Sequence, residues 1–381
     1  GPQSQRSGMM QHVSELAADP EHSALCQRFV ESLTDSSPVL ISADPPDHVR
    51  QRRLVNGAFR PSSLRAMEPT ITRIVDDLLD GILGPAANQT DETVSLDLVP
   101  PFAVMVPMVI NATALGVPDG DHKRFKRWSD AMLVALGNAH VTREQTLGFI
   151  SAQVEFGDYF APKLRQRADD PRDDLISDVA TAELDGDRLG TTEQLDMVRQ
   201  FLQAGNETTT KLLTNGVRLM AETPELQAEL RRDRSRLDAF IEESLRHESP
   251  VTGLFRTATS DVDLGGVTVL EGQWVWAAYA AANHDGAKYA DPDAFDIERF
   301  PHGQRSADHM AFGHGEHYCI GATLARTETR IAFDRLLDRT TDIRLTPHAN
   351  SFDVNPSFVL RGIESLQVDI DPAISSLKGT P

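Results

Sequence analysis

The sequence predicts a mainly α-helical fold with a smaller β portion. The first observation is helical spacing of apolar residues over about 191–222, a span far above the mean globular helix of about 11–12 residues. The second is a set of shorter amphipathic segments on both sides of it. The third is the pair of strand-like runs 262–264 and 267–269 around Gly265-Gly266, which is a hairpin signal.

Shorter elements complete this prediction. Segment 65–83 carries apolar residues at helical spacing, and Pro69 either breaks this helix or marks its true start. Other helices are expected at 125–136, 146–167, 236–247 and 322–338. Further strands are expected at 274–277 and 359–370, and a loop-rich stretch at 283–315.

The long helix at 191–222 has recognisable ends. Thr191 and Gln194 match a capping box at its start, and Pro224 follows its end. Because the helix is long and largely apolar, it is predicted to run through the centre of the molecule. Gly205 costs about 1 kcal/mol relative to Ala in a helix interior, which indicates a close approach or a local distortion there.

Composition and charge disfavour several classes of function. The formal net charge of −20 argues against broad nucleic-acid binding, which needs a basic surface. Cys26 and Cys319 are the only cysteines, so no disulfide framework is expected. No run of about 18 apolar residues and no signal peptide is found, so a cytoplasmic location without a membrane anchor is expected. Gly1-Pro2 is typical of a tag-cleavage remnant.

The richest local chemistry lies in the segment Phe312 to Gly321, which reads Phe-Gly-His-Gly-Glu-His-Tyr-Cys-Ile-Gly. A lone cysteine is most often a small buried hydrophobe. Here, however, Gly313 permits a tight turn, and Cys319 comes just before a helix, where partial positive charge favours a thiolate. Only the thiolate is a good metal ligand.

Zinc is the competing interpretation of this segment. Cys319, His317 and His314 offer three candidate metal ligands within six residues. However, no second Cys/His cluster with zinc spacing exists, since Cys26 is isolated in the sequence. A zinc site is therefore disfavoured.

The pattern Phe-Gly-x-Gly-x-His-x-Cys-x-Gly resembles the haem-binding loop of the cytochrome P450 family, with every motif position filled. The resemblance implies that Cys319 is the axial ligand of the iron of a haem b. It implies that Phe312 and Gly313 lie against the haem and that His317 bonds a propionate. A thiolate ligand donates electron density that favours cleavage of the dioxygen O–O bond.

Glu243 and Arg246 form a second candidate site. In isolation, a Glu–Arg pair three residues apart is usually a solvated helix contact worth a few tenths of a kcal/mol. The order Glu-Ser-Leu-Arg resembles the family's Glu-x-x-Arg signature, whose pair is buried and structural, and the resemblance adds Arg299 as the third partner.

The segment Ala204-Gly205-Asn206-Glu207-Thr208 is a third candidate site. Taken alone, it is a polar break in a core helix. The resemblance implies that Ala204 and Gly205 lie beside the haem, with a kink opened by Gly205. It also implies that Glu207 and Thr208 are the acid–alcohol pair that delivers protons for dioxygen cleavage. Many relatives have Asp where this chain has Glu207.

Cationic partners of the haem propionates are implied in two further segments. Asp44 to Arg53 is by itself a loop followed by the start of a basic helix. The resemblance assigns His48 and Arg52 as propionate partners, together with Arg256, which spacing alone would make a surface arginine. Arginine suits a buried carboxylate well.

The resemblance covers residue 40 to the C-terminus and implies a single P450 domain over 1–381. Haem would lie between the long central helix and the Cys319 loop. Relative to the family, residues 3–43 form a short or atypical N-terminal region, so the access side of the substrate pocket is the least constrained part of this prediction.

The implied activity is hydroxylation of a hydrophobic small molecule with dioxygen and two electrons from a ferredoxin and its reductase. Arg52, Arg53 and Arg326 are candidates for a cationic docking patch. Besides Ala204 and Gly205, the candidate pocket residues are apolar or small: Leu202, Val251, Gly253, Leu254 and Phe358.

Three alternatives stay open at this point. A peroxide-driven hydroxylase would share the fold, although peroxygenases of the family typically lack a pair such as Glu207-Thr208. A non-catalytic haem sensor would not need the Glu207-Thr208 pair, and no signalling segment is visible in the sequence. A P450 acting on a carrier-tethered substrate is equally compatible with the sequence.

Overall fold

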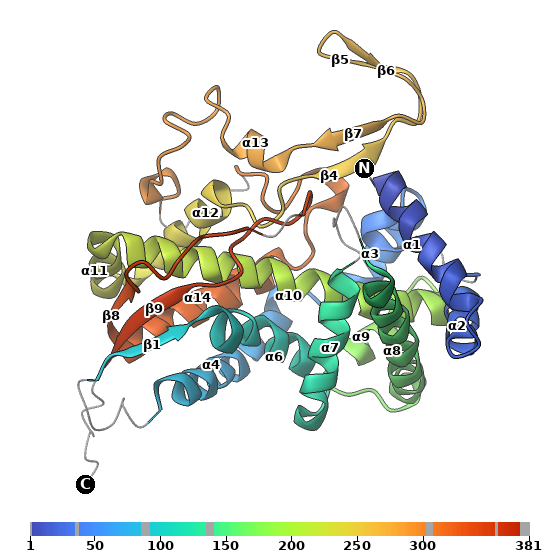
Figure 1. Cartoon of the computed structure of the whole chain (residues 1–381), viewed down its shortest axis with the longest axis horizontal. Coiled ribbons are helices and arrows are strands. Elements are labelled where there is room, and N and C mark those ends of the chain that lie inside the picture. The colour runs from blue at the N-terminus through green and yellow to red at the C-terminus, as the bar shows by residue number, and fades with distance from the viewer. Residues whose placement is uncertain are drawn as a thin grey trace.

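The computed structural model shows a mainly helical molecule with small sheets, as the sequence predicts (Figure 1). The structure describes residues 2–34, 38–84, 92–134, 141–301, 308–354 and 357–373. Its α-helices before the central one are α1 (Pro2–Ala17), α2 (Ser23–Thr34), α3 (Asp47–Val55), α4 (Pro61–Leu83), α6 (Met105–Ala114), α7 (His122–Leu133), α8 (Arg143–Asp169) and α9 (Leu175–Thr181). The others are α10 (Thr191–Glu222), α11 (Pro224–Arg232), α12 (Leu237–His247), α13 (Tyr279–Asn283) and α14 (Ala322–Arg339).

Helix α10 runs through the middle of the molecule, with helices packed on several sides (Figure 1). Its bounds and central position confirm the sequence prediction, but its cap differs. The helix begins after Gly190, whose backbone N–H donates to the Glu193 carboxylate at 2.8 Å, so the expected Thr191–Gln194 box is wrong. The carboxylate is the better partner because the N-terminal end of a helix carries partial positive charge.

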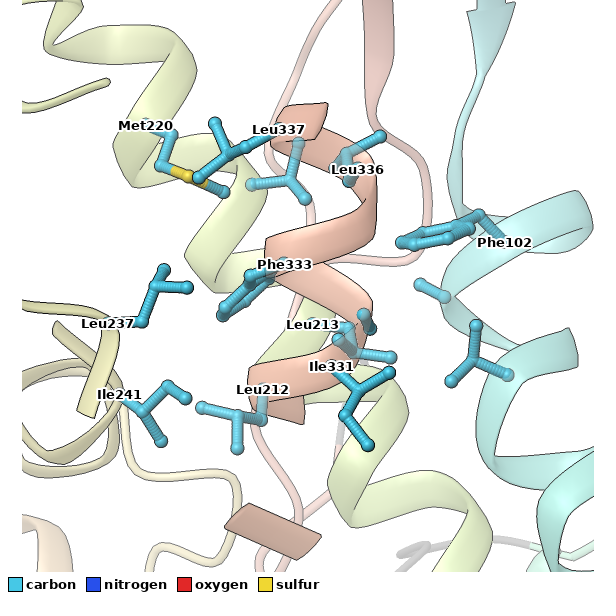
Figure 2. Close-up of a cluster of buried hydrophobic side chains, with 14 of the residues drawn as sticks. Phe102, Leu212, Leu213, Met220, Leu237, Ile241, Ile331, Phe333, Leu336 and Leu337 are labelled. Atoms are coloured by element: carbon cyan, nitrogen blue, oxygen red, sulfur yellow. The ribbon is translucent and has the colours of Figure 1, made fainter. Parts of the chain in front are cut away.

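The main hydrophobic core lies where α14 packs against α4, α10 and α12. Figure 2 shows the part of this core between α10, α12 and α14. Phe333 of α14 is fully buried and points toward α10 (Figure 2). A Cβ at Gly216 of α10 would lie 2.3 Å from the Phe333 ring, which no real contact allows. Gly216 therefore permits the close approach of the two helices that carry the site.

The β portion consists of small antiparallel sheets. The three-stranded sheet has the order β1-β9-β8, which brings Val94 opposite Ile370. A two-stranded sheet pairs β4 with β7, and the predicted hairpin β5–β6 projects from the same side of the molecule (Figure 1). The strands of these sheets are β1 (Val94–Asp97), β4 (Leu254–Thr257), β5 (Val262–Leu264), β6 (Val267–Val269), β7 (Trp274–Ala277), β8 (Thr340–Leu345) and β9 (Gln367–Pro372).

Two local expectations are wrong. The strand expected at 359–370 is confined to β9, and the chain before it forms only isolated bridges, such as Val251 with Leu360. Pro69 neither breaks nor starts α4, which begins at Pro61 and continues through Pro69. Pro61 is the better start because its missing N–H would be unpaired at the first helical position anyway.

The first two helices pack against α8 and form a small core of their own. Cys26 lies in this core and is fully buried, with Phe29 and Ile150 among its neighbours. Burial raises the pKa of the Cys26 thiol, which fits a cysteine that acts as a small hydrophobe.

Candidate functional site

The Cys319 loop is a tight turn that ends at the start of α14. Gly313 and Gly315 have φ angles of +73° and +72°, a region that L-residues rarely adopt. The Cys319 N–H donates to the Phe312 carbonyl at 2.9 Å and closes the loop. The backbone N–H groups of Gly321 and Ala322 point at the Cys319 sulfur. The loop therefore presents one sulfur, fixed by backbone contacts on both sides.

Burial governs the protonation of Cys319. It raises the pKa of this thiol, although the backbone N–H of Gly321 and the nearby Arg52 and Arg326 act to lower it. The sequence-based expectation that the helix start makes a thiolate is therefore incomplete, because desolvation outweighs it. A metal cation at the sulfur supplies the charge that a buried thiolate needs.

The zinc interpretation requires three ligands at one point. Among the described residues, no group of three or more His, Cys, Asp or Glu side chains could hold a metal ion. His317 instead stacks with His48 of α3, with ring centroids 4.1 Å apart. The geometry offers Cys319 as a single protein ligand, which suits an iron whose other ligands come from a macrocycle.

Four cationic or titratable side chains gather beside this loop: His48, Arg52, Arg256 and His317. His48 is 2% exposed, and its Nδ1 has no hydrogen-bond partner. Burial, His48 and Arg256 together lower the pKa of His317. Within the described chain, neither Arg52 nor Arg256 has a carboxylate within 4.0 Å. His48 is buried, Arg52 and His317 are half-buried and Arg256 is exposed, and together these hydrogen-bond donors fit a ligand with two carboxylates, as haem has.

A second network that the sequence analysis missed anchors the loop to α12. Glu242 is buried, and its carboxylate accepts hydrogen bonds from the Arg326 guanidinium at 2.5 and 2.7 Å. The His309 Nε2 lies 3.1 Å from the same carboxylate. The Arg326 guanidinium also lies 4.4 Å from the centre of the Phe312 ring. Burial acts to raise the pKa of Glu242, but these hydrogen bonds hold it below its usual range. The only sequence signal was two adjacent glutamates, one of which had no assigned partner.

This network also corrects the proposed docking patch. Arg326 is largely covered, with 18% of its side chain exposed, and Glu242 engages two of its nitrogens. Arg52 is half-buried and turned toward Cys319. Of the three candidates, only Arg53 is exposed. The charges that looked like a surface patch in the sequence are mostly directed inward.

Glu243 and Arg246 of α12 form a fully buried pair, and Arg299, with 13% of its side chain exposed, lies beside it. The Arg246 guanidinium donates twice to the Glu243 carboxylate, both at 2.7 Å, and neither side chain is exposed. Arg246 also donates to the carbonyls of Asn283, Pro292 and Ala294. The Arg299 Nε lies 3.4 Å from Glu243. The cluster holds the irregular segment before the Cys319 loop against α12, as the resemblance implies.

The polar segment of α10 has an open face and a buried face. Ala204 is exposed, and the Thr208 hydroxyl donates to its carbonyl at 2.9 Å. Gly205 faces the other way, where a Cβ would lie 2.5 Å from the Asn111 amide of α6. The helix assignment is continuous here and Gly205 permits a close contact with α6, while the kink that the resemblance implies stays a prediction.

The candidate pocket residues divide into two sets. Val251, Gly253 and Leu254 lie on the segment that leads into β4, and Thr252 between them donates to the Phe358 carbonyl at 2.9 Å. This bond brings together two segments that the sequence only suggested as neighbours. Leu202, in contrast, is fully buried in the core around α7 and α8, so it faces away from the open side of α10.

Glu328 of α14 is a buried carboxyl that the sequence analysis also missed. It is 2% exposed, and its Oε1 accepts the Thr209 hydroxyl at 2.9 Å while its Oε2 has no partner. Burial raises the pKa of Glu328 to about 8, against the lowering effect of Thr209. This contact links Thr209 of α10, next to Thr208, to α14, the helix that begins at Ala322 just after Cys319.

The raised pKa of Glu328 predicts a pH-dependent stability. Its folded pKa of about 8 exceeds the ordinary value of 4.5, so between these values the carboxyl ionises in the unfolded chain but stays protonated in the folded protein, and stability falls as pH rises. Glu328→Gln keeps the Thr209 contact and cannot ionise. From about pH 6 to pH 8, we expect the free energy of unfolding of the parent to fall by about 2–3 kcal/mol relative to that of the variant.

Chemical denaturation of both proteins across this pH range measures the difference. Glu364→Gln, at an exposed position, is the matched control and should show no trend with pH. A constant difference between Glu328→Gln and the parent would mean that Glu328 is not neutral in the folded protein.

Comparison with known proteins agrees with this geometry. A half-buried cysteine in a glycine-rich loop, beside four potential cations, defines a site of the haem-thiolate type. The sequence model of the Cytochrome P450 family matches residues 27–341. The chain belongs to the cytochrome P450 family, and it is a haem-thiolate monooxygenase with haem b as its cofactor.

Individual relatives share most of the chain. Cytochrome P450 107B1 of Saccharopolyspora erythraea is 38% identical over 335 residues, which are 88% of this chain and 78% of that protein. CYP109E1 of Bacillus megaterium in complex with testosterone superposes with a TM-score of 0.78 at 32% identity, covering 87% of this chain and 86% of that one. P450BioI in complex with a fatty-acyl carrier protein superposes with a TM-score of 0.78 at 30% identity, covering 90% and 84%. In the described part of the chain, no helix has the length and hydropathy needed to cross a bilayer.

Proposed function

We propose that this P450 is a cytoplasmic enzyme that hydroxylates a hydrophobic small molecule with dioxygen and electrons from a ferredoxin and its reductase. The observation that carries the proposal is the glycine-rich Cys319 loop beside His48, Arg52, Arg256 and His317. Relatives with monooxygenase activity support the reaction class. When bound, haem supplies the activation of dioxygen, with one oxygen atom going to a C–H bond and the other to water.

The haem is held by side chains from four parts of the chain. Cys319 ligates the iron, and Phe312 and Gly313 lie against the haem on the same side. His48, Arg52, Arg256 and His317 receive the propionates, which would give the unpaired Nδ1 of His48 a partner. Ala204 on the open face of α10 would border the haem, with the Gly205 backbone next to it, and the small Ala204 side chain would leave room for dioxygen and substrate.

Glu207 and Thr208 manage protons on the open face of α10. Glu207 has 24% of its side chain exposed, so it can exchange protons with water. The Thr208 hydroxyl donates to the Ala204 carbonyl and can accept a further hydrogen bond through its oxygen. Glu207 acts as the acid, and the Thr208 hydroxyl passes or orients the proton toward the reacting oxygen.

The substrate is proposed to bind against an apolar surface. Val251, Gly253, Leu254 and Phe358 carry no charge, and Phe358 is 55% exposed. An apolar site favours an apolar ligand, since water is released from both surfaces. The relatives with testosterone and with an acyl carrier protein support a steroid-like or fatty-acyl substrate, free or carrier-tethered.

Electrons come from a redox partner, as in P450s generally. We assign a ferredoxin and its reductase as this partner. Arg53 is the exposed cation of α3, the helix that also carries His48 and Arg52. A small acidic protein docked there would lie on the side of the molecule where the propionate-binding side chains gather.

Variants of the acid–alcohol pair test the proposed function. Testosterone, the ligand of a similar structure, is the first probe, with binding read from the spin state of the haem. In Glu207→Gln and Thr208→Ala, we expect product formation driven by ferredoxin to fall by about 10- to 100-fold, because positioned proton transfer contributes roughly 10²–10⁴. Consumption of NADH continues, and hydrogen peroxide is released instead of product.

Thr210→Ala is the matched control, since the Thr210 hydroxyl also donates to a carbonyl four residues earlier, at 3.0 Å. It should retain product formation. Equal product yields in Thr208→Ala and Thr210→Ala would contradict the assigned role. Faster product formation with hydrogen peroxide than with ferredoxin would favour the peroxide-driven alternative.

A further inference from the structure

Helix α3 carries two of the four proposed propionate partners, His48 and Arg52. These residues are four positions apart, so they lie on one face of the helix. His48 is 2% exposed and stacks on His317, and Arg52 is turned toward Cys319. Helix α3 has only nine residues, and a helix this short is not stable by itself in water. Its contacts with the rest of the protein therefore decide where His48 and Arg52 lie.

The opposite face of α3 is held by a carboxylate of α10. Arg50 lies two residues from both His48 and Arg52, which is about 200° around a helix. Its guanidinium contacts both carboxylate oxygens of Glu193, and the shortest of these contacts joins Nη2 to Oε2 at 3.0 Å. A second carboxylate, that of Asp187, lies 3.2 Å from the Arg50 Nε. Only 16% of the Glu193 side chain is exposed, so this contact is largely shielded from water.

The neighbouring Gln51 binds the same carboxylate. Gln51 is 1% exposed, and its Nε2 donates to the Glu193 Oε1 and to the Pro38 carbonyl, both at 3.1 Å. Its Oε1 accepts the Leu40 backbone N–H at 2.9 Å. A buried amide is costly unless its polar atoms are paired. Both amide hydrogens and the oxygen of Gln51 have partners only at this rotation of α3 and at this distance from α10.

Glu193 is itself fixed in the first turn of α10. Its Oε2 accepts the Gly190 backbone N–H, so the carboxylate that caps α10 is also the one that binds Arg50 and Gln51. Helix α10 is the long central helix, and Ala204 on its open face is proposed to border the haem. The Glu193 contacts therefore place α3 relative to the helix on which the other side of the haem site is built.

Apolar contacts hold the last turn of α3. Leu54 and Val55 are buried in the same hydrophobic cluster as Met197 and Val198 of α10. Burial of apolar surface is not directional, so these contacts keep α3 close to α10 without fixing its rotation. Hydrogen bonds are directional, which leaves the orientation of the helix to the polar network around Glu193.

We infer that Glu193 is the positioning residue of the propionate-binding helix, and that it fixes α3 on α10 so that His48 and Arg52 face the propionates of bound haem. The inference rests on the propionate roles proposed above for His48 and Arg52. Glu193 acts through Arg50 and Gln51 rather than by touching the cofactor. Removing its charge therefore loosens the haem while every group that binds the haem is still present.

Variants on both sides of the contact test this role. Glu193→Gln keeps an oxygen for the Gly190 N–H and removes the charge that holds Arg50. Arg50→Met removes the same ion pair from the side of α3 and leaves the cap of α10 intact, so it stays informative if Glu193→Gln folds poorly. Arg50→Lys keeps the charge. The matched control is Glu183→Gln, because the pair of Glu183 with Arg188 is exposed, with 45% and 61% of the two side chains accessible.

The first measurement is the rate of haem transfer from each oxidised holoenzyme to an excess of apomyoglobin, followed by the Soret absorbance. In Glu193→Gln and Arg50→Met, we expect transfer about 10-fold faster than in the parent, because residues that orient a ligand's direct partners typically contribute about 10- to 100-fold in affinity. Arg50→Lys should recover most of the loss, and Glu183→Gln should match the parent. The double variant Glu193→Gln/Arg50→Met should lose haem no faster than the faster single variant, since both residues belong to one contact.

The second measurement distinguishes positioning from a general loss of stability. The propionate bending bands of the resonance Raman spectrum respond to hydrogen bonds at the propionates. They should shift in Glu193→Gln and Arg50→Met and stay unchanged in Glu183→Gln. Parent-like haem transfer and unchanged bands in both Glu193→Gln and Arg50→Met would overturn the inference. Additive effects in the double variant, or an equal acceleration in Glu183→Gln, would overturn it as well.

Variants at His48 and Arg52 separate this inference from the proposed function. If His48→Ala and Arg52→Ala retain haem like the parent and leave the propionate bands unchanged, the assignment of α3 to the propionates fails, and the role of Glu193 fails with it. If Arg52→Ala is impaired while Glu193→Gln and Arg50→Met behave like the parent, only the role of Glu193 fails. Circular dichroism and the carbon monoxide spectrum of each variant confirm that folding and iron ligation are intact.

Discussion

Arg246→Ala is expected to leave the chain unable to form a stable haem-binding protein. The substitution removes both bonds to Glu243 and leaves its buried carboxylate with Arg299, at 3.4 Å, as its remaining cationic neighbour. It also leaves the carbonyls of Asn283, Pro292 and Ala294 without this donor. Breaking a buried pair from one side costs about 3–5 kcal/mol, out of a total stability of roughly 5–15 kcal/mol.

Chemical denaturation followed by circular dichroism, with haem content measured in parallel, checks this expectation. Arg73→Ala is the matched control, because it also removes an Arg–carboxylate pair within one helix. That pair is exposed, with 64% and 65% of the two side chains accessible, so its loss should cost about 0–1 kcal/mol. Equal denaturation midpoints for Arg246→Ala and Arg73→Ala would show that the buried cluster does not stabilise the fold.

Cys319→Ala is expected to abolish thiolate ligation and monooxygenase activity together. Cys319 is the only described cysteine near the cationic cluster, and its sulfur is the group at which the loop's backbone N–H groups converge. Without it, no side chain of the loop can donate comparable electron density to the iron. We expect the reduced, carbon-monoxide-bound protein to lose the Soret band position that names the family, and product formation to fall below detection.

Cys26→Ala is the matched control, since Cys26 is a fully buried cysteine in a separate small core. It should keep the Soret band and differ from the parent only in stability. A Soret band retained in Cys319→Ala would mean that another residue ligates the iron, and the assignment of the loop would be wrong. A band lost in both variants would point to global destabilisation.

Features written in consecutive residues could be predicted from the sequence. The bounds of α10, the β5–β6 hairpin and the strand β7 follow from spacing and turn residues within one segment. The Cys319 loop and the Glu243–Arg246 pair are likewise local motifs. Each depends on contacts within about ten residues, which a single sequence displays directly.

Contacts between distant segments could not be predicted. Glu242 meets Arg326 across 84 positions, and Gly362 accommodates Lys211 from another part of the chain. Nothing in the spacing distinguishes these residues from surface charges or loop glycines. The expected strand at 359–370 failed for the same reason, because before β9 only Leu360 and Ile363 of that segment form bridges, and these are isolated bridges to Val251 and Val354.

The Glu242 network has a consequence for how the cofactor is acquired. Because Arg326 and His309, which flank the Cys319 loop, are held to Glu242 of α12 through protein contacts alone, we expect the loop to be ordered before haem arrives. Haem binding therefore loses little conformational entropy at this side of the site, and more of the interaction energy appears as affinity. The loop acts as a preorganised receptor, so haem uptake by the folded chain can proceed without local refolding.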